Sequence, residues 1–254
     1  MNSKLKQPII ELKNLSLNIP VISTESKSLK KKILKTASGG LLVKNKNNAV
    51  IHALRNINVK FYDGERVGLL GHNGAGKSSF LRLISGIYFP SQGELITKVK
   101  VHPMIIKSFI TSPELSGEHA IRCHYLFQKG NLKGYEEFLE KVISFSGLGD
   151  YISLPLKGYS EGMSNRLIFS ILTSSKYECL ALDEGFGASD ASFFEKAKKR
   201  LEEFIDQSGS LFLASHSDEL LLKFCKRGLV FKNGEIVFDS SIQEAIKKYH
   251  ELHI

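Results

Sequence analysis

One segment constrains the fold of this chain more than any other: a glycine-rich turn that follows a short apolar run. The turn reads GHNGAGKS from Gly71 to Ser78, and the apolar run is Arg66–Leu70. Backbone N–H groups of such a turn bind phosphate oxygens, and the helix that follows adds the positive end of its dipole. Lys77–Gly86 has the apolar periodicity of that helix. Together these elements form a Walker A phosphate loop and predict a nucleoside-triphosphate site in an α/β fold.

The phosphate loop also predicts which residues hold the nucleotide. Lys77 is expected to reach the outer phosphates and to take part in catalysis, and Ser78 is expected to ligate Mg²⁺. The full set of predicted loop contacts is Gly71, Asn73, Gly74, Ala75, Gly76, Lys77, Ser78 and Ser79.

Two later apolar strands end in residues that suit hydrolysis of a bound triphosphate. The strand Glu178–Asp183 ends in Asp183, which we expect to hold Mg²⁺ through water, and is followed by Glu184, which we expect to be the general base. The strand Ser210–Ala214 is followed by His216, which should lie at the same carboxyl edge, within reach of the terminal phosphate. Each pattern alone is more often structural. The phosphate loop upstream favours the catalytic interpretation of both.

Length and composition suit a globular protein. With 254 residues, 42% of them hydrophobic and 24% charged, we expect one domain with no membrane-spanning helix and no secretory signal. Cys123, Cys179 and Cys225 lack metal-ligand spacing and are expected to be reduced, packed thiols.

The net charge of +9 is concentrated at the N-terminus. Residues 1–60 contain twelve Lys or Arg and only two acids, Glu11 and Glu25. Within them, Ser28–Lys35 has Leu29 and Ile33 four residues apart among lysines, which predicts a short basic amphipathic helix. Either a partner attracts these lysines or they form a solvated helix face.

The remaining patterns complete the predicted architecture, an α/β P-loop core with an antiparallel β subdomain (about residues 1–65) and an inserted helical subdomain (about 112–172). Antiparallel strands are expected first, strand-like runs from 95 to 110, and helices between Ser116 and Ile171. The other expected elements are strands Ile9–Leu17 and Ala53–Phe61, helix Glu195–Phe204, a hairpin Gly228–Phe238 with an Asn-Gly turn, and a closing helix Ile242–Leu252.

A further motif resembles the signature of ABC ATPases. Tyr159–Met163 reads YSEGM, and Ser160 follows Lys77 by 83 residues. With the phosphate loop, Asp183-Glu184 and His216, four motifs in the order of that family cover residues 66–217. The resemblance implies a RecA-like core that binds ATP and Mg²⁺ and acts as a dimer, in which Ser160 and Gly162 contact ATP held by the other copy. It also implies a ring near residues 50–52 that stacks on adenine, for which His52 is the candidate.

Finer features are similar to one subgroup, the ATPases that export O-antigen, capsular polysaccharide or teichoic acid. They include the block Asn48–Ile57, the segment Pro113–Glu118, the Tyr-Ser-x-Gly-Met signature and the segment Gly187–Phe193. The likeness implies a separate permease, two copies of each subunit, a lipid-linked glycan as cargo and a peripheral location at the cytoplasmic face of the inner membrane. For the basic insertion the hypothesis is then that Lys30, Lys31, Lys32 and Lys35 attract anionic lipid or the pyrophosphate of the substrate, and the alternative is a solvated helix face. No C-terminal carbohydrate-binding domain is expected within these residues.

The chain departs from the family pattern in two places. Glu161 stands where the signature usually has Gly or Ser, and 104–111 contain no Gln for the usual Q-loop, with Lys107 as the nearest polar residue. Asp190 fits either the family's D-loop or a helix N-cap. Alternative functions are a soluble ABC ATPase of translation or DNA repair and a nucleotide-sensing regulator. The single ATPase unit argues against the first, and we expect no nucleic-acid partner.

Overall fold

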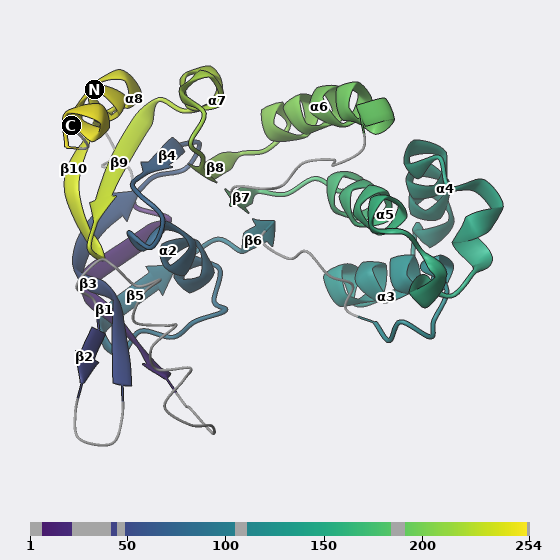
Figure 1. The fold of residues 1–254 in the computed structure, drawn as a ribbon, viewed down its shortest axis with the longest axis horizontal. Coiled ribbons are helices and arrows are strands. Elements are labelled where there is room, and N and C mark those ends of the chain that lie inside the picture. The colour runs from purple at the N-terminus through teal and green to yellow at the C-terminus, as the bar shows by residue number, and fades with distance from the viewer. Residues whose placement is uncertain (1–6, 22–41, 45–48, 105–110, 184–190, 253–254) are drawn as a thin grey trace. The chain divides into compact units, whose positions relative to one another are not determined.

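The computed structural model describes residues 7–21, 42–44, 49–104, 111–183 and 191–252 (Figure 1). Two compact units divide the chain. The first comprises Met1–Pro103, Glu178–Glu184 and Gly209–Ile254, and the second comprises Met104–Tyr177 and Gly185–Ser208. The predicted basic helix with its four lysines lies outside the described residues, as do Lys107, Glu184 and Asp190.

The first unit contains a four-stranded sheet in the order β2-β3-β1-β5. Its strands are β1 (Ile10–Val21), β2 (Leu42–Lys44), β3 (Ala49–Phe61) and β5 (Gln92–Thr97). The antiparallel pairing of β1 with β3 is confirmed, but both strands run four residues further than predicted. Pro20 is tolerated there because, among the described residues, β5 pairs with β1 only as far as Ser16 and so does not need the N–H that Pro20 lacks.

The same unit contains a six-stranded sheet in the order β10-β9-β4-β8-β7-β6. Its strands are β4 (Arg66–Leu70), β6 (Val101–Met104), β7 (Cys179–Leu182), β8 (Ser210–Ala214), β9 (Arg227–Lys232) and β10 (Glu235–Ser241). β4 pairs in parallel with β8 and β9, and β7 pairs in parallel with β8. The carboxyl ends of β4, β7 and β8 therefore lie at one edge, as predicted.

Aromatic packing joins the two sheets through helix α2 (Lys77–Ile84). Phe80 of α2 is fully buried, and its ring lies 6.1 Å from Phe61 of β3, 6.4 Å from Phe212 of β8 and 5.3 Å from Phe231 of β9. Such tilted and edge-to-face contacts add to the free energy of burying each ring. This core fixes the helix that begins at the phosphate loop.

Helices α7 (Asp218–Phe224) and α8 (Ile242–Glu251) pack on the six-stranded sheet, α8 beside β9 and β10 (Figure 1) and α7 against β4. They approach closely because Gly68 and Gly228 have no side chains. A Cβ at Gly68 would lie 2.7 Å from Ile242 Cδ1 of α8 and 2.9 Å from Leu221 Cδ2 of α7, and one at Gly228 would lie 2.4 Å from Ala245 Cβ of α8. The sequence patterns predicted α8 but not α7.

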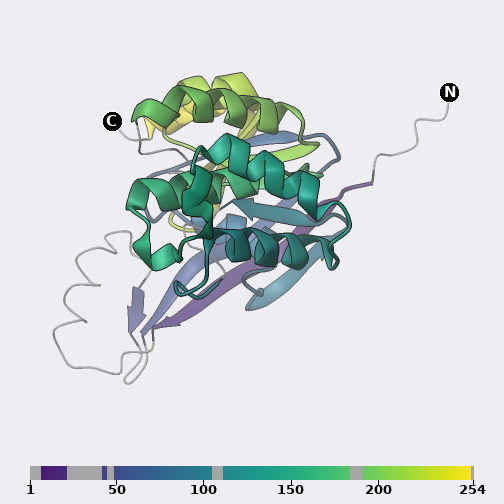
Figure 2. The same ribbon diagram turned by 90° about the vertical axis from the view of Figure 1, so that its right-hand side faces the viewer.

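The second unit is helical. Helices α3, α4 and α5 lie side by side in both views (Figures 1 and 2) and share an apolar cluster that includes Ile121, Val142 and Leu167. Its elements are α3 (Gly117–Lys129), α4 (Tyr135–Ser146), η1 (Gly149–Ser153), η2 (Leu156–Gly158), α5 (Glu161–Thr173) and α6 (Ala191–Asp206). The predicted helical segment, residues 112–172, falls inside this unit, which also takes in α6. No helix of the described residues is both long and apolar enough to cross a membrane.

The thiols are not all packed. Cys179 and Cys225 are buried, and burial raises the pKa of each thiol to about 12. Cys123 is exposed, so the prediction of a packed thiol is wrong there. The reason is the amphipathic arrangement of α3, in which Ala120 and Ile121 face the core and Cys123 does not.

Candidate nucleotide site

The phosphate loop has the backbone conformation that its glycines predict. Gly71, Gly74 and Gly76 have φ angles of 148°, 84° and 115°, in the region that favours glycine. A Cβ at Gly71 would lie 2.6 Å from the backbone oxygen of Phe231, so no larger residue fits there. Gly76 precedes α2 and supplies no side-chain cap. The first turn of α2, with Ser78 and Ser79 half-buried in it, therefore begins directly at the loop.

Lys77 places its ammonium group within the loop. The residue is buried, with 7% exposure, and Nζ donates hydrogen bonds to the carbonyl oxygens of Gly71 and of His72, the latter at 3.3 Å. A positive charge surrounded by loop backbone, at a helix N-terminus, is the arrangement that suits triphosphate oxygens.

Strand register brings the other predicted residues of this unit to the same edge. Leu182 of β7 pairs with Leu213 of β8, and Ala214 of β8 pairs with Leu69 of β4. Asp183, one residue beyond β7, is thereby set at the edge from which the phosphate loop leaves β4. Its carboxylate and the Ser78 hydroxyl are hard oxygen donors, which Mg²⁺ prefers while taking its remaining ligands from water and substrate phosphates.

His216 reaches the phosphate loop from β8. Its Nε2 lies 3.3 Å from Asn73 Oδ1, although the two residues are 143 positions apart in the chain. The prediction that His216 lies at this carboxyl edge is confirmed. Its role toward a terminal phosphate stays a prediction, as does that of Glu184, which lies outside the described residues.

The phosphate loop is also held by the β9–β10 turn, through a contact that the sequence patterns do not predict. The β9–β10 turn was predicted, and Asn233 and Gly234 have φ angles of 51° and 80°. Its docking was not predicted: Gly234 N–H donates to Ala75 O at 2.9 Å, and Arg55 N–H donates to Gly234 O at 2.8 Å. The Arg55 side chain also donates from Nε to Asn233 O at 3.0 Å. The turn thus ties the phosphate loop to β3.

His52 lies on β3, one residue before Ala53, whose backbone oxygen is within 3.0 Å of where a Cβ of Gly76 would lie. Its Nδ1 makes a 2.7 Å hydrogen bond with Asn18 Oδ1. This bond uses the ring edge, whereas stacking on adenine would use a ring face. Stacking by His52 stays a prediction.

The signature residues lie in the second unit, at the start of α5. Ser160 caps the helix, with Oγ accepting a hydrogen bond from Met163 N–H at 3.2 Å, and Gly162 lies in the first turn. Glu161 is exposed. The Arg166 guanidinium, in the same helix, lies over the Phe193 ring at 5.4 Å. The predicted contact of Ser160 and Gly162 with a partner's ATP stays a prediction.

Comparisons with known proteins bear on these observations. The family profile described as ABC transporter matches residues 54–187. The O-antigen export system ATP-binding protein RfbE of Yersinia enterocolitica is 36% identical over 229 residues, which span 90% of this chain and 96% of that protein. The teichoic acids export ATP-binding protein TagH of Listeria monocytogenes is 31% identical over 239 residues, spanning 94% of this chain and 71% of that protein.

Solved structures support the fold. The ATP-binding cassette MJ0796, in a dimeric post-hydrolysis state bound to ADP and phosphate, superposes with a TM-score of 0.65 at 18% identity, covering 92% of this chain and 98% of that one. An ATP-binding subunit of an ABC transporter gives the same TM-score at 20% identity, covering 95% of this chain and 93% of that one. The predicted P-loop fold with an antiparallel β subdomain is confirmed.

Proposed function

Because this chain belongs to the ABC transporter family of ATP-binding proteins, we propose that it is the ATP-hydrolysing subunit of an exporter of lipid-linked polysaccharide. The observation that supports hydrolysis best is the convergence of three distant segments at one sheet edge: the phosphate loop, Asp183 after β7, and His216 beside Asn73. Binding of Mg²⁺ and nucleotide accounts for the loop and Asp183, whereas His216 beside Asn73 is a residue that binding alone does not need.

Each residue then has a chemical role. Lys77 and the loop N–H groups neutralise charge on the outer phosphates, and His216 contacts the terminal phosphate. Ser78 and Asp183 hold Mg²⁺, which when bound neutralises developing charge on the phosphates. Glu184 follows Asp183 and takes a proton from the attacking water. Ser160 and Gly162 complete the site from a second copy, through the N-terminus of α5.

The cargo assignment rests on the relatives. RfbE is named for O-antigen export and TagH for teichoic acid export, and this chain spans nearly all of RfbE. We infer that two copies bind an integral-membrane permease at the cytoplasmic face of the inner membrane and energise export of a glycan of that class.

Transport can be measured in inverted membrane vesicles that contain this chain and its permease. The proposal expects ATP-dependent accumulation of a radiolabelled, polyprenyl-pyrophosphate-linked glycan inside the vesicles. Vesicles carrying Lys77→Ala give the background, because that variant lacks the phosphate-binding ammonium. Uptake equal to background in the wild type, with ATP hydrolysis intact, would reject the cargo and leave the ATPase assignment standing.

The basic N-terminal segment has a proposed role in the same exporter. We infer that Lys30, Lys31, Lys32 and Lys35 contact anionic lipid or the substrate's pyrophosphate, each basic residue contributing about 1 kcal/mol near such a surface. Reversing Lys30–Lys32 to Glu should lower uptake in the vesicle assay while basal ATP hydrolysis is unchanged. Unchanged uptake would show that these lysines form only a solvated face.

A further inference from the structure

The signature begins with a tyrosine whose side chain is anchored, although the residues that follow it are exposed. Ser160 and Glu161 are exposed, whereas Tyr159 is half-buried and packs against the apolar cluster shared by α3, α4 and α5. Its hydroxyl donates a hydrogen bond to the backbone oxygen of Tyr151, in η1, at 2.7 Å. The Tyr159 side chain therefore fixes the chain directly before the N-cap of α5.

The Tyr159 hydroxyl has a defined space and a defined acceptor. A Cβ at Gly117, the first residue of α3, would overlap the hydroxyl oxygen. Gly117 is helical, so this position requires space rather than a positive φ. The acceptor, Tyr151 O, also accepts from Leu154 N–H at 3.0 Å, which uses its second lone pair. Burial raises the pKa of the Tyr159 phenol above its ordinary range, so the hydroxyl stays protonated and can donate.

The segment between η1 and the signature is itself fixed by backbone pairing. Leu156 N–H donates to Leu115 O at 2.9 Å, and Lys157 N–H donates to Pro113 O at 2.8 Å. An exposed ion pair of 2.6 Å between Lys157 and Glu114 lies beside these bonds. The chain that leads into α3 and the chain that leads into the signature therefore form one framework, and Tyr159 extends it to α5.

The first turn of α5 depends on where Ser160 lies. Tyr159 and Ser160 are both extended, with φ and ψ of −78° and 139° and of −65° and 162°. Ser160 Oγ accepts from Met163 N–H at 3.2 Å, and Ser160 O accepts from Ser164 N–H at 3.0 Å. Because these bonds begin the helix, the position of Ser160 determines where the N–H groups of the first turn point.

We propose that Tyr159 is a positioning residue for the signature: its hydroxyl, bonded to Tyr151 O in the space beside Gly117, holds Ser160 and the first turn of α5 in place for a partner's ATP. The inference rests on the proposed function, in which Ser160 and Gly162 complete the nucleotide site of a second copy. Tyr159 acts through Ser160 rather than on the nucleotide. Without the anchor, a smaller fraction of the chains has the signature in the competent position, and hydrolysis slows in proportion.

Amide hydrogen exchange in the full chain tests the anchoring without ATP. Tyr159→Phe removes only the hydroxyl, and the protection of the Met163 and Ser164 amides should fall by about three- to tenfold, the factor that one net hydrogen bond supplies. Tyr125→Phe is a matched control, because it removes a hydroxyl that donates to Lys133 O in the same unit. The control should leave both amides unchanged. Unchanged protection in Tyr159→Phe, or an equal loss in the control, would overturn the proposal.

ATP hydrolysis by the assembled transporter tests the consequence for the reaction. Tyr159→Phe should lower the kcat by a similar factor, about three- to tenfold, and leave the affinity for Mg-ADP unchanged, because the phosphate loop belongs to the other unit. Tyr125→Phe should hydrolyse ATP at the wild-type rate.

Ser160→Ala separates this inference from the proposed function on which it rests. If Ser160→Ala lowers the kcat and Tyr159→Phe does not, the positioning role of Tyr159 is overturned. If neither variant lowers the kcat, the proposed contact between the signature and a partner's ATP is wrong, and the inference falls with it.

Discussion

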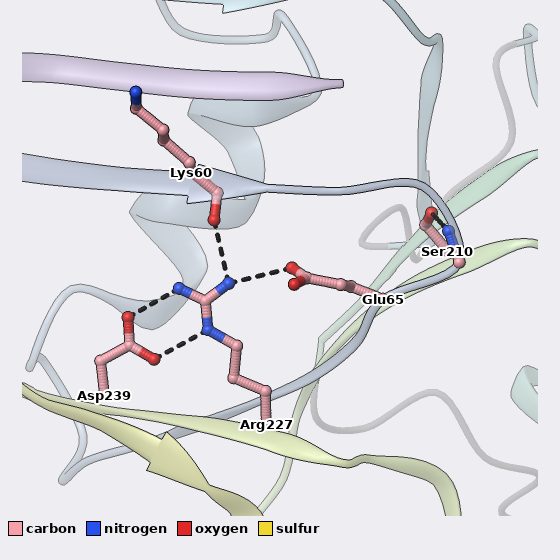
Figure 3. Close-up of polar contacts among 6 residues, drawn as sticks. Lys60, Glu65, Ser210, Arg227 and Asp239 are labelled. Atoms are coloured by element: carbon pink, nitrogen blue, oxygen red, sulfur yellow. Dashed lines mark hydrogen bonds and ion pairs between the residues drawn. The ribbon is translucent and has the colours of Figure 1, made fainter. Parts of the chain in front are cut away.

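Arg227 is the residue whose removal should destabilise the first unit most clearly. Its guanidinium donates two hydrogen bonds to Asp239, one to Glu65 and one to the backbone oxygen of Lys60 (Figure 3). It also lies 5.2 Å from the Phe61 ring centroid. Hydrogen bonds to Asp239 raise the pKa of Arg227 further. The contacts join β9 to β10, to the turn before β4, and to β3 in the other sheet. Arg227→Met removes these guanidinium contacts while keeping most of the aliphatic part of the side chain.

The expected cost lies between that of a surface ion pair and that of a buried one. Exposed pairs contribute about 0–1 kcal/mol, and breaking a buried pair costs about 3–5 kcal/mol. Side-chain exposures of 25% for Arg227, 28% for Glu65 and 37% for Asp239 place this cluster between those limits. We expect Arg227→Met to lower the free energy of unfolding by about 3 kcal/mol, and the melting temperature by about 6–12 °C.

Differential scanning calorimetry measures this effect, with Lys141→Met as the control. Lys141 pairs with Glu137, but the side chains are 55% and 74% exposed, so the loss should be at most about 0.5 kcal/mol. If Arg227→Met melts within about 1 °C of the control, the reasoning that this cluster joins the two sheets is wrong.

Two further changes test the site and the thiols. Gly234→Ala should raise the KM for ATP and weaken ADP binding. The φ of Gly234 is 80° and a Cβ would lie 2.9 Å from Ala53 O, so the substitution displaces the turn whose N–H bonds Ala75 O. Titration with Mg-ADP measures the affinity, and an unchanged affinity would refute the role of the turn. A thiol reagent at pH 8 should modify one cysteine per native chain, the exposed Cys123. Burial raises the pKa of Cys179 and Cys225 to about 12, so both stay protonated and unreactive. Rapid reaction of three thiols before unfolding would contradict the packing.

The elements predictable from sequence are those whose signal is local. The glycines predict the phosphate loop, and Asn233-Gly234 predict a turn because both residues tolerate positive φ. The position of His216 near the phosphate loop was also predictable, because parallel strands share a carboxyl edge, and the structure places it beside Asn73.

The features that escaped prediction depend on contacts distant in sequence. Helix α7 has only seven residues, too few for a periodic signal, although Ser217 caps it by accepting from Leu220 N–H. Asn14 and Asn56 adopt φ angles of 46° and 45° next to shifts in the register between β1 and β3, and no sequence pattern predicts these shifts. The docking of the hairpin turn on Ala75 and the contacts of Arg227 likewise arise only when separate strands meet.

The most direct test of the account is the rate of ATP hydrolysis by Glu184→Gln in the assembled transporter. If Glu184 is the general base beside Asp183, the kcat should fall by about 10²–10⁴-fold, while ATP binding through Lys77 and the phosphate loop persists. Hydrolysis at the wild-type rate would contradict the assignment of this chain's catalytic centre.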